Sequence, residues 1–160
     1  MARNLRDERR SIVYHFPAAL GNQGATGTWG LVNNTGVATV AASQTAATFC
    51  IPLKLMQGSI ITAFKVSGQL ESAGGIATLD ADLRATTAAA ADLTDASVGA
   101  ITQISKTADY LIADSKLALS HTVIPGNSYY VLVTVTTAAA TDIALQGVEV
   151  TVEELSEGTV

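Results

Sequence analysis

The sequence is poor in the residues that carry most protein chemistry. Its 160 residues include one cysteine and two histidines, and only 14% of them are charged. A single cysteine, Cys50, excludes an intramolecular disulfide framework and a cysteine-based zinc site. Two histidines, His15 and His121, argue against a histidine metal cluster within one chain. We therefore expect neither a bound metal nor another cofactor.

Long hydrophobic runs are also missing. The longest ones, such as residues 129–133, are far too short to span a bilayer. The basic start followed by residues 11–20 partly resembles a signal peptide. However, Tyr14, His15 and Pro17 interrupt the apolar region, and no Ala-x-Ala cleavage site follows at the right distance. We expect a soluble chain with its own N-terminus and no membrane partner.

The net charge of −5 is unevenly distributed along the chain. Residues 1–10 carry four arginines against two acidic side chains, a local balance of +2. The remaining 150 residues carry five basic and twelve acidic side chains, a balance of −7. An acidic body disfavours nucleic acid as a partner, because phosphate binding needs a basic face. A basic segment on an acidic body indicates attachment to another acidic surface or to a neighbouring copy of the chain.

Short alternating segments with turn residues between them dominate from Phe49 onward. Residues 76–86 alternate strictly, with an apolar set that includes Leu79 and a polar set that includes Asp80. This period of two predicts a strand with one solvated face. Residues 129–137 are β-branched and aromatic, which predicts a buried central strand. Within residues 142–154 the alternation shifts phase at Gly147, which indicates a β-bulge.

The other segments complete an all-β pattern. Pro52 confines the expected strand at residues 48–55 to an edge or a bulge. We expect a hairpin connection at residues 72–75 and a short helix or loop crossing at residues 87–95. Further strands are expected at residues 59–70, 98–105, 110–113 and 117–124. Seven or eight strands at roughly 8–12-residue spacing predict a single antiparallel β-sandwich or jelly roll with an extended N-terminal arm.

The first 48 residues differ in kind from the rest. A short helix is possible at residues 4–11, and glycine occurs at every third position from Gly21 to Gly30. We expect residues 1–48 to form an extended arm, residues 49–155 to form the body and residues 156–160 to form an acidic tail. Aromatic and arginine side chains are the usual anchors of interfaces. The expected partner-binding residues are Arg3, Arg6, Arg9, Arg10, Tyr14, Phe16 and Trp29.

Whether this arm packs back on its own sandwich or reaches a neighbour stays open at this point.

The body is rich in alanine and threonine, with 27 and 20 of these residues in the chain. Alanine removes little apolar area from water when it is buried. We therefore expect oligomerisation to supply part of the stability.

No constellation of residues predicts an enzyme. Asp80 and Asp82 leave the same face of a strand, but a solvated strand face explains them better than a catalytic pair. Asp92 and Asp95 lack the terminal glutamate of a complete calcium loop. The chain has no Gly-x-Ser-x-Gly motif beside either histidine. We expect a binding or structural protein.

Three stretches resemble virion structural proteins of tailed bacteriophages. The first is residues 117–135, with the core Val-Ile-Pro-Gly-Asn-Ser-Tyr-Tyr-Val-Leu-Val-Thr-Val, and the second is residues 145–152, which read Leu-Gln-Gly-Val-Glu-Val-Thr-Val. The third stretch is Pro-Leu-x-Leu-x-x-Gly-Ser-Ile-Ile-Thr-Ala-Phe at residues 52–64. The resemblance covers residues 49–154 and rests on strand and turn residues.

This resemblance implies a capsid decoration (cement) protein. Such a protein is commonly a homotrimer on the capsid surface of the virion, where it bridges copies of a major capsid protein. The arginine-rich arm would then reach the neighbour. Two alternatives stay open. One is a carbohydrate-binding, lectin-like sandwich of a phage fibre or cell surface, and the other is a minor capsid or tail building block.

Overall fold

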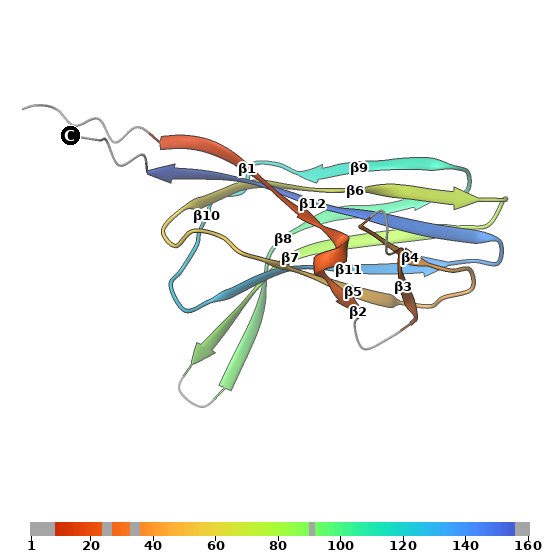
Figure 1. Ribbon diagram of the computed structural model, residues 1–160, viewed down its shortest axis with the longest axis horizontal. Coiled ribbons are helices and arrows are strands. Elements are labelled where there is room, and N and C mark those ends of the chain that lie inside the picture. The colour runs from red at the N-terminus through yellow and green to blue at the C-terminus, as the bar shows by residue number, and fades with distance from the viewer. Residues whose placement is uncertain (1–8, 24–26, 33–35, 90–91, 156–160) are drawn as a thin grey trace, which may run out of the picture.

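The computed structural model describes residues 9–23, 27–32, 36–89 and 92–155 (Figure 1). All strand pairings in this part of the chain are antiparallel. The elements are β1 (Arg9–Pro17), the 3-10 helix η1 (Ala18–Leu20), β2 (Asn22–Gln23), β3 (Trp29–Val32), β4 (Val37–Val40), β5 (Ala47–Leu53), β6 (Ile60–Ser72), β7 (Ala77–Ala89), β8 (Asp92–Lys106), β9 (Tyr110–Lys116), β10 (His121–Thr122), β11 (Ser128–Thr137) and β12 (Thr141–Leu155).

These strands form two sheets that pack face to face. In the seven-stranded sheet, β6 and β12 are central; β9 and β10 flank β6, β1 and β4 flank β12, and β3 follows β4. The five-stranded sheet has the order β2-β5-β11-β7-β8. The molecule is therefore an antiparallel β-sandwich, which confirms the predicted fold class for the body.

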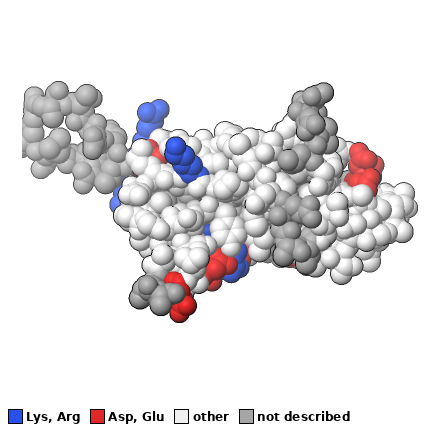
Figure 2. Space-filling view, turned by 60° about the horizontal axis from the view of Figure 1, so that its bottom comes forward, with Lys and Arg blue, Asp and Glu red and all other residues white. Residues whose placement is uncertain are grey.

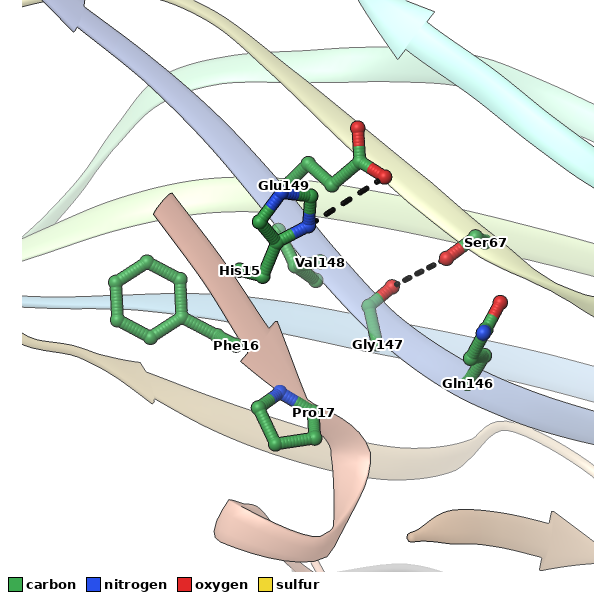
Figure 3. A pocket seen from close by; sticks show the side chains of 8 residues that line it. All are labelled: His15, Phe16, Pro17, Ser67, Gln146, Gly147, Val148 and Glu149. Atoms are coloured by element: carbon green, nitrogen blue, oxygen red, sulfur yellow. Dashed lines mark hydrogen bonds and ion pairs between the residues drawn. The ribbon is translucent and has the colours of Figure 1, made fainter. Parts of the chain in front are cut away.

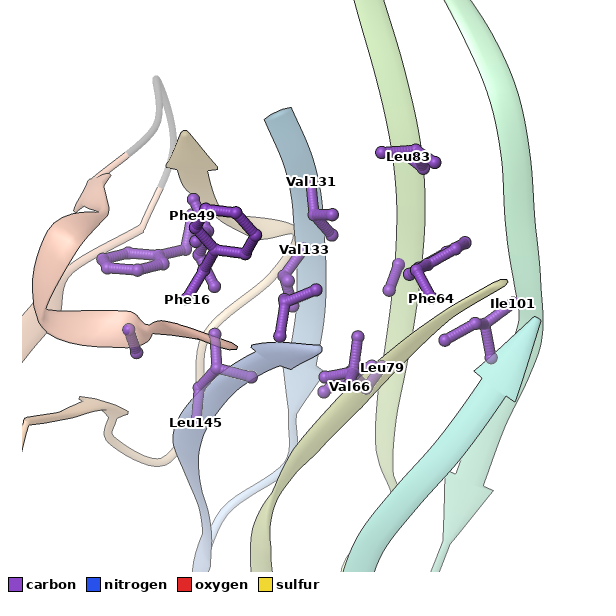
Figure 4. Close-up of a cluster of buried hydrophobic side chains, with 14 of the residues drawn as sticks. Phe16, Phe49, Phe64, Val66, Leu79, Leu83, Ile101, Val131, Val133 and Leu145 are labelled. Carbon is purple, nitrogen blue, oxygen red and sulfur yellow. The ribbon is translucent and has the colours of Figure 1, made fainter. Parts of the chain in front are cut away.

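Strict alternation along the strands separates the core from the surface. On β7, Leu79 and Leu83 have no exposed surface, whereas Asp82 and Arg84 face outward. On β11, Val131, Val133 and Val135 are likewise fully buried, which confirms the predicted buried central strand. Figure 4 shows Leu79, Leu83, Val131 and Val133 between the two layers, together with Phe64, Val66 and Leu145 of the opposite sheet. Outside this core, charged side chains are sparse and stand in small groups on the face shown in Figure 2.

The predicted bulge lies in β12, which is the partner of both β6 and β1. The register of β12 against β6 jumps between Leu145 and Gly147, so Gln146 is the extra residue. A Cβ atom on Gly147 would lie 2.5 Å from the carbonyl oxygen of Phe16. Only glycine lets β1 approach β12 this closely, and the bulge and the end of β1 therefore meet at this point.

Two expected connections are wrong. Residues 72–75 do not make a hairpin, because β6 and β7 belong to different sheets and this segment crosses between them. Of residues 87–95, the described ones, 87–89 and 92–95, are strand and neither helix nor loop. Here β7 continues to Ala89 and pairs with β8 from Asp92 onward, as a ribbon that projects beyond the other strands in Figure 1. Cross-strand pairing overrides the helix propensity of the alanines, even though alanine is the strongest helix former.

The described part of the expected N-terminal arm belongs to the sandwich instead. β1 pairs along β12 from Arg9 opposite Leu155 to Pro17 opposite Gly147. β3 and β4 extend the same sheet, and β2 pairs with β5 in the other one. Residues 9–11 of the possible helix are strand, because their backbone groups pair with β12. The rest of that helix and the tail at 156–160 lie outside the described residues.

Candidate functional site

The residues expected to bind a partner do not gather on one exposed surface. Phe16 and Trp29 are each only 8% exposed and pack in the chain's own core. Tyr14 is half-buried, and Arg9 lies 3.8 Å from Glu153 of the neighbouring strand. Of the three aromatic residues expected to bind a partner, Phe16 and Trp29 therefore fill the chain's own core instead. Arg10 is exposed, and the expected residues Arg3 and Arg6 lie outside the described part of the chain.

A different surface collects polar side chains from strands that are distant in sequence. It is the outer face of the five-stranded sheet, which we call the Arg84 face. Directly paired residues point to the same side of a sheet. The register therefore arranges the residues of this face in three rows that run across the strands in the order β5, β11, β7 and β8. The first row is Pro52, Tyr130, Arg84 and Ser97; the second is Cys50, Leu132, Asp82 and Ala100; the third, which ends at β7, is Thr48, Thr134 and Asp80.

Arg84 is held rigidly at the centre of this face. Its Nη1 donates to Asp82 Oδ2 at 2.6 Å and its Nε donates to Asp95 Oδ2 at 2.8 Å. The hydrogen bond to Asp95 is the main cause that raises the pKa of Arg84. Ser97 Oγ donates to the second oxygen of Asp82 at 2.5 Å. The guanidinium side chain is 24% exposed, so it is fixed in place and still open to a ligand.

Tyr130 is the aromatic side chain beside this network. Tyr130 pairs directly with Arg84 across the sheet, and burial, followed by a hydrogen bond with Asp95, raises the pKa of its hydroxyl. Further along the sheet, Gln103 donates to Asp80 at 2.9 Å. At the projecting end, Leu93 pairs with Ala88 and is 76% exposed. The face therefore combines fixed donors and acceptors with apolar surface.

Only some of the residues of this face can be predicted from the sequence. The alternation of residues 76–86 correctly separates Asp80, Asp82 and Arg84 from the apolar set, and we interpreted them as a solvated strand face. The link to Asp95 was not predicted, because residues 87–95 were expected to leave the sheet. Knowledge of the β7–β8 register is needed to bring Asp95 and Ser97 beside Arg84.

A concave site, which we call the Gly147 hollow, lies on the seven-stranded sheet. It is a cavity of about 340 Å³ at the bulge of β12, where β1 ends (Figure 3). Glu149 Oε1 on its rim lies 3.6 Å from both His15 Nδ1 and Lys65 Nζ. The residues that line the hollow are His15, Phe16, Pro17, Ser67, Gln146, Gly147, Val148 and Glu149.

Neither site has the donor set of a metal centre. Within residues 9–155, excluding the gaps given above, no three histidine, cysteine, aspartate or glutamate side chains are grouped to hold a metal ion. The same described residues contain no helix of sufficient length and hydrophobicity to cross a membrane.

Comparison with known proteins gives a likeness in fold. No protein-family model matches the chain, and no curated protein matches its sequence. The CBM22-1–GH10 modules of Clostridium thermocellum endo-1,4-beta-D-xylanase 10B, complexed with xylohexaose, match with a TM-score of 0.54 and 14% identity, over 91% of this chain and 28% of that chain. The CBM36-1 domain of a multidomain xylanase from the hindgut metagenome of Trinervitermes trinervoides matches with a TM-score of 0.50 and 12% identity, over 88% of this chain and 96% of that one. The chain shares the β-sandwich fold of these carbohydrate-binding modules.

Proposed function

We propose that the chain is a carbohydrate-binding β-sandwich module and that the Arg84 face is its glycan site. The proposal rests on one observation above all. Arg84 is locked between Asp82 and Asp95 at 2.6 and 2.8 Å, beside Tyr130, on an open sheet face. The likeness in fold to modules of xylan-degrading enzymes supports the same reading.

The chemistry of the face suits a hydroxyl-rich ligand. Sugar hydroxyls both donate and accept hydrogen bonds. Asp80, Asp82 and Asp95 offer acceptor oxygens, and Arg84 offers donors in a fixed planar arrangement. Because ion pairs hold Asp82, Arg84 and Asp95 in place and Gln103 donates to Asp80, ligand binding costs little side-chain entropy. The ring of Tyr130 supplies a flat apolar surface of the kind that packs against the C–H face of a sugar.

The face is expected to act by binding alone. The described residues of the Arg84 face include no histidine, and its one thiol, Cys50, is half-buried. Burial raises the pKa of the Cys50 thiol, and the nearby Asp95 raises it further. A thiol in such surroundings is a poor nucleophile. We therefore propose a binding role without catalysis.

Affinity electrophoresis through gels that contain soluble xylan, mixed-linkage β-glucan or galactomannan tests this function. We expect at least one of these polysaccharides to retard the chain, and Tyr130→Ala to abolish the retardation. Tyr110→Ala is the matched control, because Tyr110 is also half-buried with its hydroxyl against an aspartate, Asp114, at 3.1 Å. Unretarded migration of the wild-type chain in all three gels contradicts the proposal, and so does equal retardation of the Tyr130→Ala variant.

A second candidate function is that of a decoration protein on a phage capsid surface. Exposed apolar side chains favour this candidate. Leu93 and Leu111 are each 76% exposed and Leu117 is 66% exposed. In an assembly, contacts with copies of the chain or with a major capsid protein would cover such side chains. This candidate predicts a homotrimer. Light scattering that gives the mass of a single chain at every concentration contradicts it.

A further inference from the structure

We propose that the Gly147 hollow is a second ligand site, which takes one neutral sugar ring. It lies on the sheet opposite the Arg84 face, so it does not depend on the function proposed for that face. Its position, its size and its polar groups each contribute to this inference.

The fold itself creates the hollow. β1 pairs with β12 up to Pro17 opposite Gly147, and β4 pairs with β12 from Leu145 opposite Ala38. The extra residue of the bulge, Gln146, lies between these two pairings, and neither β1 nor β4 pairs with it. The missing side chain of Gly147 lets the end of β1 lie directly against the bulge, since a Cβ there would meet the carbonyl oxygen of Phe16 at 2.5 Å. The opening therefore lies where the pairing of β12 with β1 ends and its pairing with β4 begins.

The size and walls of the hollow suit a small ring. Its volume of about 340 Å³ lies at the lower end of the roughly 300–1,000 Å³ of small-molecule sites. Phe16 and Val148 are buried beneath it, and Pro17 is exposed at its rim. In Figure 3, the rings of His15 and Pro17 stand on the β1 side, opposite Gln146 and Ser67. A ligand with an apolar ring face and polar edges matches these surroundings.

The polar groups of the hollow favour a neutral ligand. The carboxylate of Glu149 is balanced by Lys65, which lies 3.6 Å away, so neither a carboxylate nor an amine meets an uncompensated opposite charge. Gln146 is exposed, and its amide makes no hydrogen bond within the described residues, so it is available as both donor and acceptor. Ser67 Oγ makes only a long contact of 3.5 Å to the carbonyl of Gly147. Hydroxyl groups satisfy such a mixed set better than a charged group does.

Titration of the full ¹⁵N-labelled chain with methyl β-D-xylopyranoside and methyl β-D-glucopyranoside tests the proposal. We expect saturable shifts of the backbone amides of Phe16, Gly147 and Glu149 with at least one glycoside. Gln146→Ala should weaken this binding about tenfold, the loss expected for one hydrogen-bonding group. The matched control is Gln69→Ala, because Gln69 is an exposed glutamine on β6 of the same sheet. It should leave the affinity unchanged.

Two results would overturn the proposal. One is the absence of saturable shifts at these amides with both glycosides. The other is tighter binding of glucuronate than of either glycoside, because a negatively charged sugar should gain nothing from a site with balanced charge. The Tyr130→Ala variant distinguishes the two sites: it should lose polysaccharide retardation and keep the glycoside shifts at the hollow.

Discussion

The hydroxyl of Tyr14 lies 2.6 Å from Oε1 of Glu154, so a side-chain hydrogen bond ties the first described strand to the last one. Glu154 is only 8% exposed, and Tyr14 donates to its carboxylate. The contact adds to nine backbone pairings between β1 and β12, from Arg9 to Pro17. The N-terminal strand is thus fixed to the body by both main chain and side chain.

Tyr14→Phe should destabilise the chain by about 1–3 kcal/mol, because it leaves a buried carboxylate without its donor. Urea unfolding followed by circular dichroism measures this loss. Tyr110→Phe is the control, since its hydroxyl contacts the solvent-accessible carboxylate of Asp114, and its loss should be smaller. Equal losses in the two variants would show that Glu154 does not depend on Tyr14.

The same contact predicts a pH dependence. The hydrogen bond to Glu154 is the main cause that raises the pKa of Tyr14 above its ordinary value of 10.0. Folding therefore favours the protonated phenol, and this stabilisation is fully present below pH 10 and is lost as the pH rises through the raised pKa. The stability difference between wild type and Tyr14→Phe should shrink above pH 10. A constant difference from pH 8 to pH 11 would contradict this linkage.

Phe16→Ala should cost about 3–5 kcal/mol, the usual loss for a large aromatic side chain removed from a core. Val13→Ala on the same strand is the control, because Val13 is 48% exposed and should change stability by at most about 0.5 kcal/mol. Thermal unfolding of both variants measures the difference. If Phe16→Ala costs no more than Val13→Ala, residues 9–17 are a separable arm after all.

The sequence predicts the strands whose alternation is local, and it misses those whose pairing is distant. Leu79 and Asp80 reveal the two faces of β7 because the period of two is visible within one strand. The phase shift at Gly147 likewise marks the bulge of β12. In contrast, β1 is stabilised by a partner at the other end of the chain, so this segment before the glycine-rich stretch looks like an arm in the sequence.

The candidate site follows the same rule. Arg84 and Asp82 occupy one strand, and their common face is readable from the alternation. Asp95 and Ser97 join them only through the β7–β8 register, which an alanine-rich segment does not reveal. The Gly147 hollow needs three strands at once, since β1, β6 and β12 all supply residues that line it.

The alkylation rate of the Cys50 thiol can be used to detect ligand binding at the Arg84 face. Cys50 pairs with Leu132, which in turn pairs with Asp82, so its thiol lies on that face. Because burial raises its pKa, its alkylation by iodoacetamide at pH 8 should be slower than that of a free thiol. A polysaccharide that retards the chain should slow the reaction further. An alkylation rate that is the same with and without that polysaccharide would place the glycan elsewhere.

Titration of the ¹⁵N-labelled chain with xylohexaose and other neutral hexasaccharides locates the glycan site from its backbone amide shifts. We expect the largest saturable shifts on β7, β8 and β11, at Asp82, Arg84, Asp95, Ser97 and Tyr130. Arg84→Met should remove these shifts without unfolding the chain. Shifts that fall only outside these three strands, or no saturable shift with any neutral hexasaccharide, would contradict a glycan site on the Arg84 face.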